Sequence, residues 1–187
     1  YIVPNEAMQH LTGVMGCIMC GACVSDCTVL EVDKNFLGPA ALAKAYRFVA
    51  DPRDNADDSR LRSYEKYGGI WDCTRCYECV QVCPKGVAPM DRIMTLRDKA
   101  VEAGFNKTVG ARHTEIFTDT VRHSGWLDEL RLAIKTPGIF NLSAQISQFR
   151  WIGFKAGLRG KMPSLFHKSI PGVRNIKRIF ERIEGKR

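Results

Sequence analysis

Two runs of four cysteines constrain this chain more than any other feature of its sequence. The first run contains Cys17, Cys20, Cys23 and Cys27. The second run repeats the same spacing and contains Cys73, Cys76, Cys79 and Cys83. Together the runs hold all eight cysteines of the 187-residue chain, and Pro84 follows the second run directly. Because thiolates at such short intervals can converge on a metal centre, metal binding is expected to be part of how the chain folds.

The spacing favours iron–sulfur clusters. In a C-x2-C-x2-C-x3-C-P run, the fourth cysteine ligates the cluster that the other run holds. One 4Fe–4S cluster is therefore expected on Cys17, Cys20, Cys23 and Cys83. The second cluster is expected on Cys73, Cys76, Cys79 and Cys27. This crossed arrangement would join two segments that are distant in the sequence into one folded unit.

Zinc and disulfide bonds are the alternative interpretations of these cysteines. A structural zinc site typically uses two Cys-x2-Cys pairs, so the third and fourth cysteines of each run would be surplus. Disulfide frameworks are typical of small secreted domains, whereas the cysteines of this longer chain are too clustered to join distant loops. The iron–sulfur interpretation is therefore preferred.

The rest of the sequence predicts helices and loops. Apolar residues recur every three to four positions, and no alternating strand pattern is present. Pro39 suits the first position of a helix, and the buried face of a later helix is expected to contain Ile93, Leu96, Ala100 and Val101. The expected helices are 6–14, 40–50, 90–103, 114–123, 126–135, a helix that has Asn141 as its N-cap and runs to about residue 157, and 174–183. The predicted fold is all-α, with a cluster domain at residues 1–105 and a helical extension at residues 106–187.

The positive charge of the chain is concentrated in the extension. The net charge is +8, and residues 151–187 contain ten Lys or Arg but only Glu181 and Glu184 as acids. We expect this basic segment to dock on a partner subunit or to make a peripheral contact with an anionic membrane surface. The apolar face available for either contact contains Ile176, Ile179, Phe180 and Ile183. Nucleic-acid binding is not expected, because no recognition motif accompanies the charge.

Several residues near the runs are expected to shape the cluster environment. Gly16 and Gly21 would let backbone N–H groups approach the sulfurs, which raises a cluster's reduction potential. An apolar wall against water is expected from Ile18, Met19, Ala22 and Val24. The cations Lys66, Arg75 and Lys85 either influence the clusters or are simply solvated, and Trp71 and Tyr77 are expected to pack over a cluster.

Four short segments carry a resemblance to a known family. Residues 36–42 (FLGPAAL), 45–48 (AYRF), 51–54 (DPRD) and 83–89 (CPKGVAP) resemble the C-terminal domain of succinate dehydrogenase and fumarate reductase iron–sulfur subunits. The resemblance covers roughly residues 15–104. It implies an alpha-helical ferredoxin fold without flavin on this chain, and electron transfer between a flavoprotein catalytic subunit and a second redox site. It also implies a complex on the inner, cytoplasmic face of the cytoplasmic membrane.

The second run departs from the common form of that family. The common form has Cys-x5-Cys-x3-Cys-Pro, holds a 3Fe–4S cluster and carries a histidine after its first cysteine. This chain has Cys76 inside that interval and Thr74 in place of the histidine. A second 4Fe–4S cluster is therefore expected instead of 3Fe–4S, and the quinone role of the histidine does not carry over. The full cysteine set resembles the non-classical branch of the family, with its methylmenaquinol:fumarate reductases, and the C-type electron-transfer subunit of heterodisulfide reductase. Proteins of both kinds pair with a cysteine-rich or membrane-anchor subunit.

The function hypotheses are therefore three. The first is an electron-transfer subunit of a succinate or fumarate oxidoreductase, linked to a quinone or thiol partner. The second is a heterodisulfide reductase C-type subunit, which would be favoured if the chain is complete, because the plant-type 2Fe–2S run of the first family is not in this sequence. The third is a diffusible two-cluster ferredoxin, which would not need the basic extension. No catalytic triad or phosphate-binding loop is visible, so no catalysis by the chain alone is expected.

Overall fold

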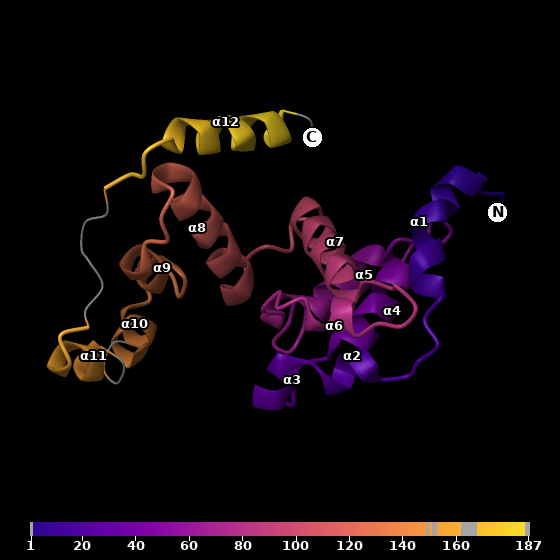
Figure 1. Cartoon of the computed structure of the whole chain (residues 1–187), viewed down its shortest axis with the longest axis horizontal. Helices are drawn as coiled ribbons and strands as arrows, with labels where there is room; N and C mark the ends of the chain where they lie inside the picture. The colour runs from indigo at the N-terminus through magenta and orange to yellow at the C-terminus, as the bar shows by residue number, and fades with distance from the viewer. Residues whose placement is uncertain (1, 149, 151–152, 162–167, 186–187) are drawn as a thin grey trace. The chain divides into compact units, whose positions relative to one another are not determined.

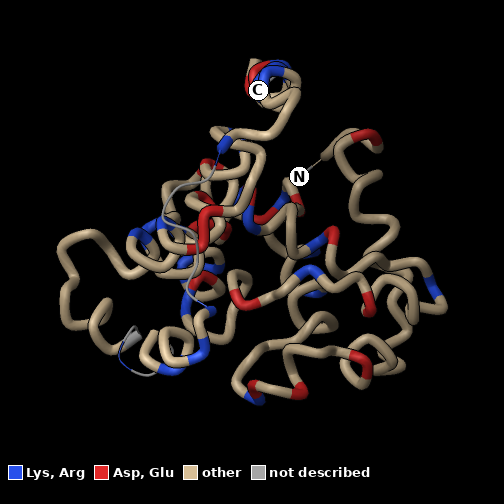
Figure 2. Tube along the Cα trace, turned by 60° about the vertical axis from the view of Figure 1, so that its left-hand side comes forward, with Lys and Arg blue, Asp and Glu red and all other residues tan. Residues whose placement is uncertain are grey.

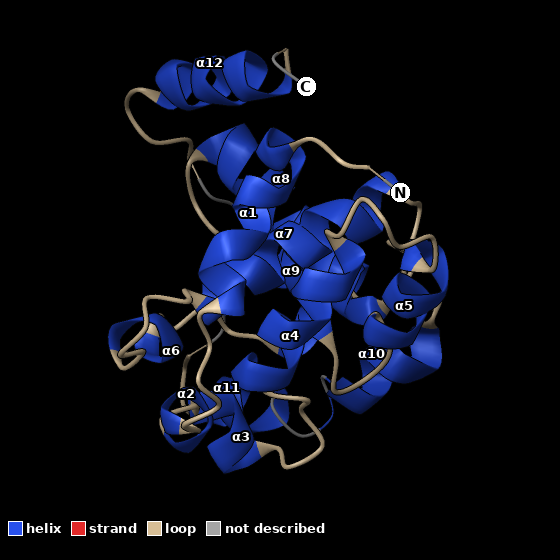
Figure 3. Cartoon of the chain, turned by 90° about the vertical axis from the view of Figure 1, so that its right-hand side faces the viewer, coloured by secondary structure: helices blue, strands red, loops and turns tan. Residues whose placement is uncertain are grey.

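The computed structural model describes residues 2–148, 150, 153–161 and 168–185. Within these ranges the chain consists of helices and loops without any strand, which confirms the all-α prediction (Figure 3). The chain packs as two compact units, Tyr1–Thr108 and Val109–Arg187 (Figure 1). The boundary predicted after residue 105 lies three residues before this division.

The first unit contains both cysteine runs. Three of its helices were predicted to within one residue at each end, and the shorter helices were not predicted individually. The helices of this unit are α1 (Asn5–Met15), α2 (Ala22–Ser25), α3 (Thr28–Val32), α4 (Pro39–Val49), α5 (Asp57–Tyr64), η1 (Ile70–Asp72), α6 (Glu78–Gln81) and α7 (Pro89–Glu102).

The core of the first unit lies between α4 and α7, which pack against each other. Leu42 of α4 and Leu96 of α7 are fully buried there. The face predicted for α7 is correct for Ile93, Leu96 and Ala100 but wrong for Val101, which is 45% exposed. Arg97 is buried instead, because at 100° per residue it lies nearer the centre of the face than Val101 does. This buried cation contacts the backbone at the start of the second cysteine run.

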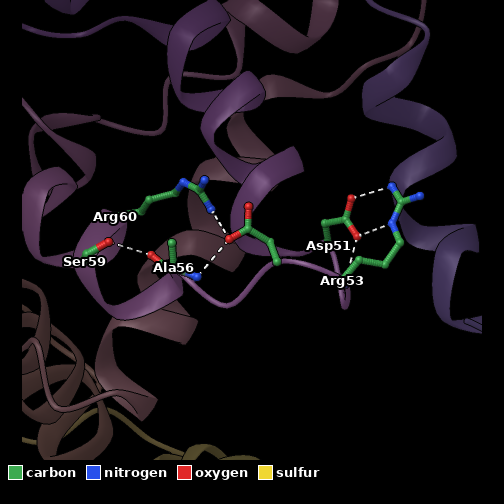
Figure 4. Close-up of polar contacts among 6 residues, drawn as sticks. Asp51, Arg53, Ala56, Ser59 and Arg60 are labelled. Carbon is green, nitrogen blue, oxygen red and sulfur yellow. Dashed lines mark hydrogen bonds and ion pairs between the residues drawn. The ribbon is translucent and has the colours of Figure 1, made fainter. Parts of the chain in front are cut away.

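The charged segment between α4 and α5 forms an ordered loop (Figure 4). The carboxylate of Asp51 accepts hydrogen bonds from the Arg53 backbone N–H and from the Arg53 guanidinium, at 2.7–3.0 Å. Asp54 accepts from the Ala56 N–H at 2.8 Å and pairs with Arg60 at 2.6 Å. These local bonds hold the loop that joins the two helices.

The second unit contains five helices in its described residues: α8 (Val109–Ser124), α9 (Glu129–Lys135), α10 (Leu142–Gln148), α11 (Phe154–Leu158) and α12 (Val173–Glu184). Both α9 and α12 contact α8. The side chain of Asp128 caps α9 by accepting from the Arg131 N–H at 2.8 Å, so this helix begins three residues after the predicted start at 126. Buried residues are few and small in this unit, and among the residues described they are Ala111, Thr120, Thr136 and Pro137.

The helix predicted to run from an Asn141 cap to about residue 157 agrees with the residues that the structure describes there. Asn141 does cap its beginning, because its Oδ1 accepts from the Ala144 N–H at 3.3 Å. Helices α10 (Leu142–Gln148) and α11 (Phe154–Leu158) are α-helical, and residues 150 and 153 between them are π-helical, while residues 149, 151 and 152 lie outside the described residues. Gly153, which precedes α11, has helical φ and ψ angles of −63° and −42°.

Candidate metal centres

The two cysteine runs fold into the same backbone shape. Met19 and Gly21 of the first run have φ angles of 60° and 78°, and Arg75 and Tyr77 of the second run have 62° and 69°. In each run the second of these residues is the N-cap of a one-turn helix, α2 or α6. A left-handed φ costs a residue with a side chain roughly 1–2 kcal/mol. Such strain typically persists where the backbone must serve a site.

The fold brings the first three cysteines of one run together with the last cysteine of the other. The larger of two cavities has a volume of ≈ 220 Å³, and its cysteines are Cys17, Cys20, Cys23 and Cys83. The smaller cavity has a volume of ≈ 20 Å³, and its cysteines are Cys27, Cys73, Cys76 and Cys79. This grouping is the one that the crossed ligand assignment requires. All eight thiols are free of disulfide bonds.

The loop after the first cysteine run is hydrogen-bonded to the loop before the second run. The Leu37 N–H donates to the Gly68 carbonyl at 2.7 Å, and the Gly68 N–H donates to the Asp72 carboxylate at 2.5 Å. Gly68 has a φ of 83°, and a Cβ at this position would lie 2.4 Å from the carbonyl oxygen of Asn35. Glycine is therefore required where the loop before the second run approaches the loop after the first run.

The first cysteine group, around the larger cavity, has apolar walls and an open side. Its lining includes Ile18, Met19, Val24 and Val87. Ile18 and Met19 are 60% and 67% exposed, so the predicted apolar wall is present but does not exclude solvent on this side. The Val87 N–H donates to the Cys83 sulfur at 3.3 Å. Gly21 has a left-handed φ of 78° and Gly16 a helical φ of −70°, and the close approach of backbone N–H groups to the sulfurs at these two glycines stays a prediction.

The second cysteine group, around the smaller cavity, is more enclosed. Cys79 is buried, and burial raises its pKa to about 11, partly offset by a hydrogen bond from the Met90 backbone. Burial also raises the pKa of Cys73. The Thr28 hydroxyl donates to the Cys76 sulfur at 3.5 Å and lowers the pKa of that exposed thiol. Because metal ligation requires thiolates, a buried thiol in this group must lose its proton when it binds iron.

Arg97 is the residue of the site that the sequence analysis missed. Its guanidinium is 5% exposed and donates to the carbonyl oxygens of Ile70, Trp71 and Cys73 at 2.7, 3.0 and 2.7 Å. Burial is the main cause that lowers its pKa to about 10, and the nearby charge of Arg75 adds to this effect. Arg97 thus holds the backbone that enters the second run and brings a positive charge beside Cys73. The sequence pattern that could have identified Arg97 is a cation within an otherwise apolar helical face.

The other residues predicted to act near the clusters have distinct positions. Tyr77 lines the second cavity and is 52% exposed, whereas Trp71 is buried under the Arg97 guanidinium, 5.4 Å from its ring centre. Lys85 lines the first cavity, and Lys66 lines neither. The His10 ring forms a hydrogen bond with the Ala50 carbonyl at 2.8 Å.

The donor set fits iron–sulfur clusters better than a single ion. In the described part of the chain, no group of three or more His, Cys, Asp or Glu side chains is placed to hold one metal ion. The sulfurs instead surround hollows with apolar walls and backbone N–H donors, as cluster ligation requires. The site residues therefore fit two clusters, each ligated by four thiolates.

Comparison with known proteins agrees with this chemistry. The family model described as "4Fe-4S dicluster domain" matches residues 13–87. The 8-methylmenaquinol:fumarate reductase iron-sulfur subunit of Wolinella succinogenes is 35% identical over 137 residues, which is 72% of this chain and 43% of the relative. The fumarate reductase iron-sulfur subunit of Escherichia coli O6:H1 is 39% identical over 40% of this chain and 30% of the relative.

A third relative is the succinate dehydrogenase iron-sulfur subunit of Paracoccus denitrificans, at 35% identity over 52% of this chain and 38% of the relative. The chain thus spans less than half the length of these relatives. Among the described residues, no helix has the length and apolar character to cross a membrane. The cysteine-bearing part of this chain is a 4Fe–4S dicluster domain of the succinate dehydrogenase and fumarate reductase iron–sulfur subunit family.

Proposed function

We propose that this chain is the electron-transfer subunit of a succinate dehydrogenase or fumarate reductase type of respiratory complex. In this role it relays electrons between a flavoprotein catalytic subunit and a quinone- or thiol-linked partner subunit. The observation that carries the proposal is the sorting of the eight cysteines into two groups of four, each drawn from both runs. When bound, 4Fe–4S clusters accept and release single electrons without making covalent bonds to a substrate.

The chain's own residues hold the clusters and set their surroundings. Cys17, Cys20, Cys23 and Cys83 would ligate one cluster, and Cys27, Cys73, Cys76 and Cys79 the other. Backbone N–H groups near the sulfurs, such as that of Val87, raise the reduction potential of a cluster because they stabilise its more negative reduced state. The buried guanidinium of Arg97 acts in the same direction on the second cluster.

The position of Cys76 supports 4Fe–4S over 3Fe–4S in the second site. Cys76 lines the same cavity as Cys73 and Cys79, so a fourth thiolate is available once Cys27 is counted. A 4Fe–4S cluster needs four thiolate ligands, and a site of this composition provides all four. The quinone contact made through a histidine in the common form has no counterpart at Thr74.

The extent of the match to the Wolinella relative favours the fumarate reductase branch over heterodisulfide reductase. That match covers 72% of the chain, whereas the cysteine-bearing unit ends at Thr108, so part of the match falls in the extension. The proposal includes a cysteine-rich or membrane-anchor partner and a location at the inner face of the cytoplasmic membrane. These features follow from the resemblance to that branch.

Anaerobic purification of the tagged full chain from its native cells tests the proposal. We expect about eight irons and eight sulfides per chain, no 3Fe electron paramagnetic resonance signal as isolated, and two interacting reduced centres after dithionite. We also expect a flavin-containing subunit to co-purify, and the clusters of that complex to change oxidation state with succinate or fumarate.

The isolated chain is the control and should respond to dithionite but not to succinate. About seven irons with a 3Fe signal would contradict the second 4Fe–4S site. A stable flavin-free monomer from native cells would contradict the complex. A thiol- and disulfide-handling partner without response to succinate or fumarate would instead establish the heterodisulfide reductase alternative.

A further inference from the structure

Residues 130–180 of the extension combine exposed apolar side chains with charges of one sign. Between Glu129 and Glu181 the sequence contains no Asp or Glu, while ten Lys and Arg occur in the same interval. Figure 2 marks these basic positions in blue along the trace. The described residues of this interval also include apolar side chains with unusually high exposure, namely Phe140 at 98%, Leu142 at 66%, Phe154 at 66% and Leu158 at 74%.

Helix α12 also carries exposed basic and apolar side chains, together with two acids, Glu181 and Glu184. Four basic side chains, Arg174, Lys177, Arg178 and Arg182, are exposed on it. Its apolar residues occupy one face at i, i+3, i+4 and i+7 spacing, starting from Ile176. Part of that apolar face packs against α8, and the rest of it is exposed to solvent.

The packed part of this apolar face anchors α12 to α8. Phe180 is half-buried and lies under the Arg122 guanidinium, 4.6 Å from its ring centre, and Arg122 also pairs with Glu184. The Ile170 N–H donates to the Ser124 carbonyl at 2.9 Å just before α12 begins. These contacts hold the helix in place along the end of α8 (Figure 1).

The exposed part of the apolar face of α12 consists of Ile179 and Ile183, which are 57% and 56% exposed. They are four residues apart and therefore project from the same side of the helix. A preformed helix with exposed isoleucines and basic neighbours has the properties of an interfacial helix, whose apolar face enters a bilayer surface while Lys and Arg reach anionic headgroups.

We infer that the extension of this chain binds an anionic lipid surface directly, through Ile179 and Ile183 with the basic side chains of α12. Charge complementarity favours an anionic lipid surface as the binding partner of this helix. The long interval without acids is attracted to an anionic bilayer, because the negative surface draws each nearby Lys or Arg. The inference does not depend on the electron-transfer role, since it requires neither the clusters nor a flavoprotein.

Flotation of the full cluster-loaded chain with vesicles tests this inference. Vesicles of phosphatidylcholine with phosphatidylglycerol should carry the protein upward at low salt, and vesicles of phosphatidylcholine alone should not. Salt near 1 M should release most of the bound protein, because it shortens the screening length to about 3 Å. Equal binding to both vesicle types, or no binding to either, would overturn the inference.

Paired variants connect the binding to α12. Lys177→Gln with Arg178→Gln should weaken binding about 30-fold, and the matched change Lys34→Gln with Lys66→Gln in the first unit should leave it unchanged. Glutamine keeps the helix propensity nearly constant, so a loss of binding would reflect charge. Equal binding by both double variants would overturn the role of α12.

The apolar contribution has its own variant and control. Ile179→Ser with Ile183→Ser should weaken binding on the order of 100-fold, because about half of each side chain would leave water on binding. Val32→Ser, at an 89% exposed position of the first unit, should have no effect. If these serines leave vesicle binding unchanged while a purified protein partner shields α12 from hydrogen exchange, the surface is a protein-docking site and the inference is wrong.

Discussion

Replacing Arg97 by methionine would remove the buried cation that connects α7 to the backbone in front of the second cysteine run. Arg97 donates three hydrogen bonds there, and bonds from a charged donor are worth about 1.5–3 kcal/mol each. Burial and a neighbouring cation lower its pKa to about 10. At about 1.4 kcal/mol per pKa unit, keeping the guanidinium charged offsets roughly 3 kcal/mol of that gain. The variant should therefore lose about 2–5 kcal/mol of local stability.

Native-state hydrogen exchange with mass spectrometry on the anaerobic, cluster-loaded protein measures this loss. The amides of residues 69–75 should exchange about 30-fold to several thousand-fold faster in Arg97→Met, since exchange follows the free energy of local opening. Peptides from α8 and α9 in the second unit should not change. Arg97→Lys should fall between parent and methionine variant, because one ammonium cannot replace the planar guanidinium on three carbonyls.

Arg92→Met is the matched control within the same helix. Arg92 is half-buried and donates one bond, to the Val87 carbonyl at 3.3 Å, so its loss should have a smaller effect that does not reach residues 69–75. The reasoning is refuted if Arg97→Met leaves protection at Ile70–Asp72 unchanged. It is equally refuted if the Arg92 and Arg97 variants accelerate exchange there to the same degree.

Three further predictions concern single positions. Cys76→Ala should reduce the iron content from about eight to about seven per chain and produce a 3Fe signal as isolated, and an unchanged iron content would show that Cys76 is not a ligand. Gly21→Ala meets no atom within 4 Å, so it should lower the temperature of cluster loss through left-handed strain of about 1 kcal/mol alone. Tyr77→Gly should raise that temperature, and a change of the same sign in both variants would contradict the strain argument. Burial raises the pKa of Asp57 above its ordinary 3.8. The folded state therefore holds this proton more tightly than the unfolded chain does, so stability should fall as pH rises from about 4. Asp57→Asn should flatten this decline in urea unfolding measured across pH, whereas parallel profiles would rule out a contribution from Asp57.

The helices that sequence patterns located well are those whose signals are local. Pro39 and Pro89 occupy first helical positions, and the apolar repeat after each one matches the packed faces of α4 and α7. The Asn141 cap was also readable, because a capping bond spans three residues. The helix predicted to continue from this cap to about residue 157 is likewise helical at each of its described residues.

The sequence by itself determined the chemistry of this protein and its helical character, because cysteine spacing and apolar periodicity act over a few residues. Only the tertiary structure decided which side chains meet. The packing of α4 on α7 places Cys83 beside the first run, buries Arg97 against the backbone of the second, and leaves Val101 in water. Likewise, the docking of α12 on α8 buries part of its apolar face and leaves Ile179 and Ile183 exposed. These outcomes depend on contacts between residues far apart in the chain, so no local pattern carries them.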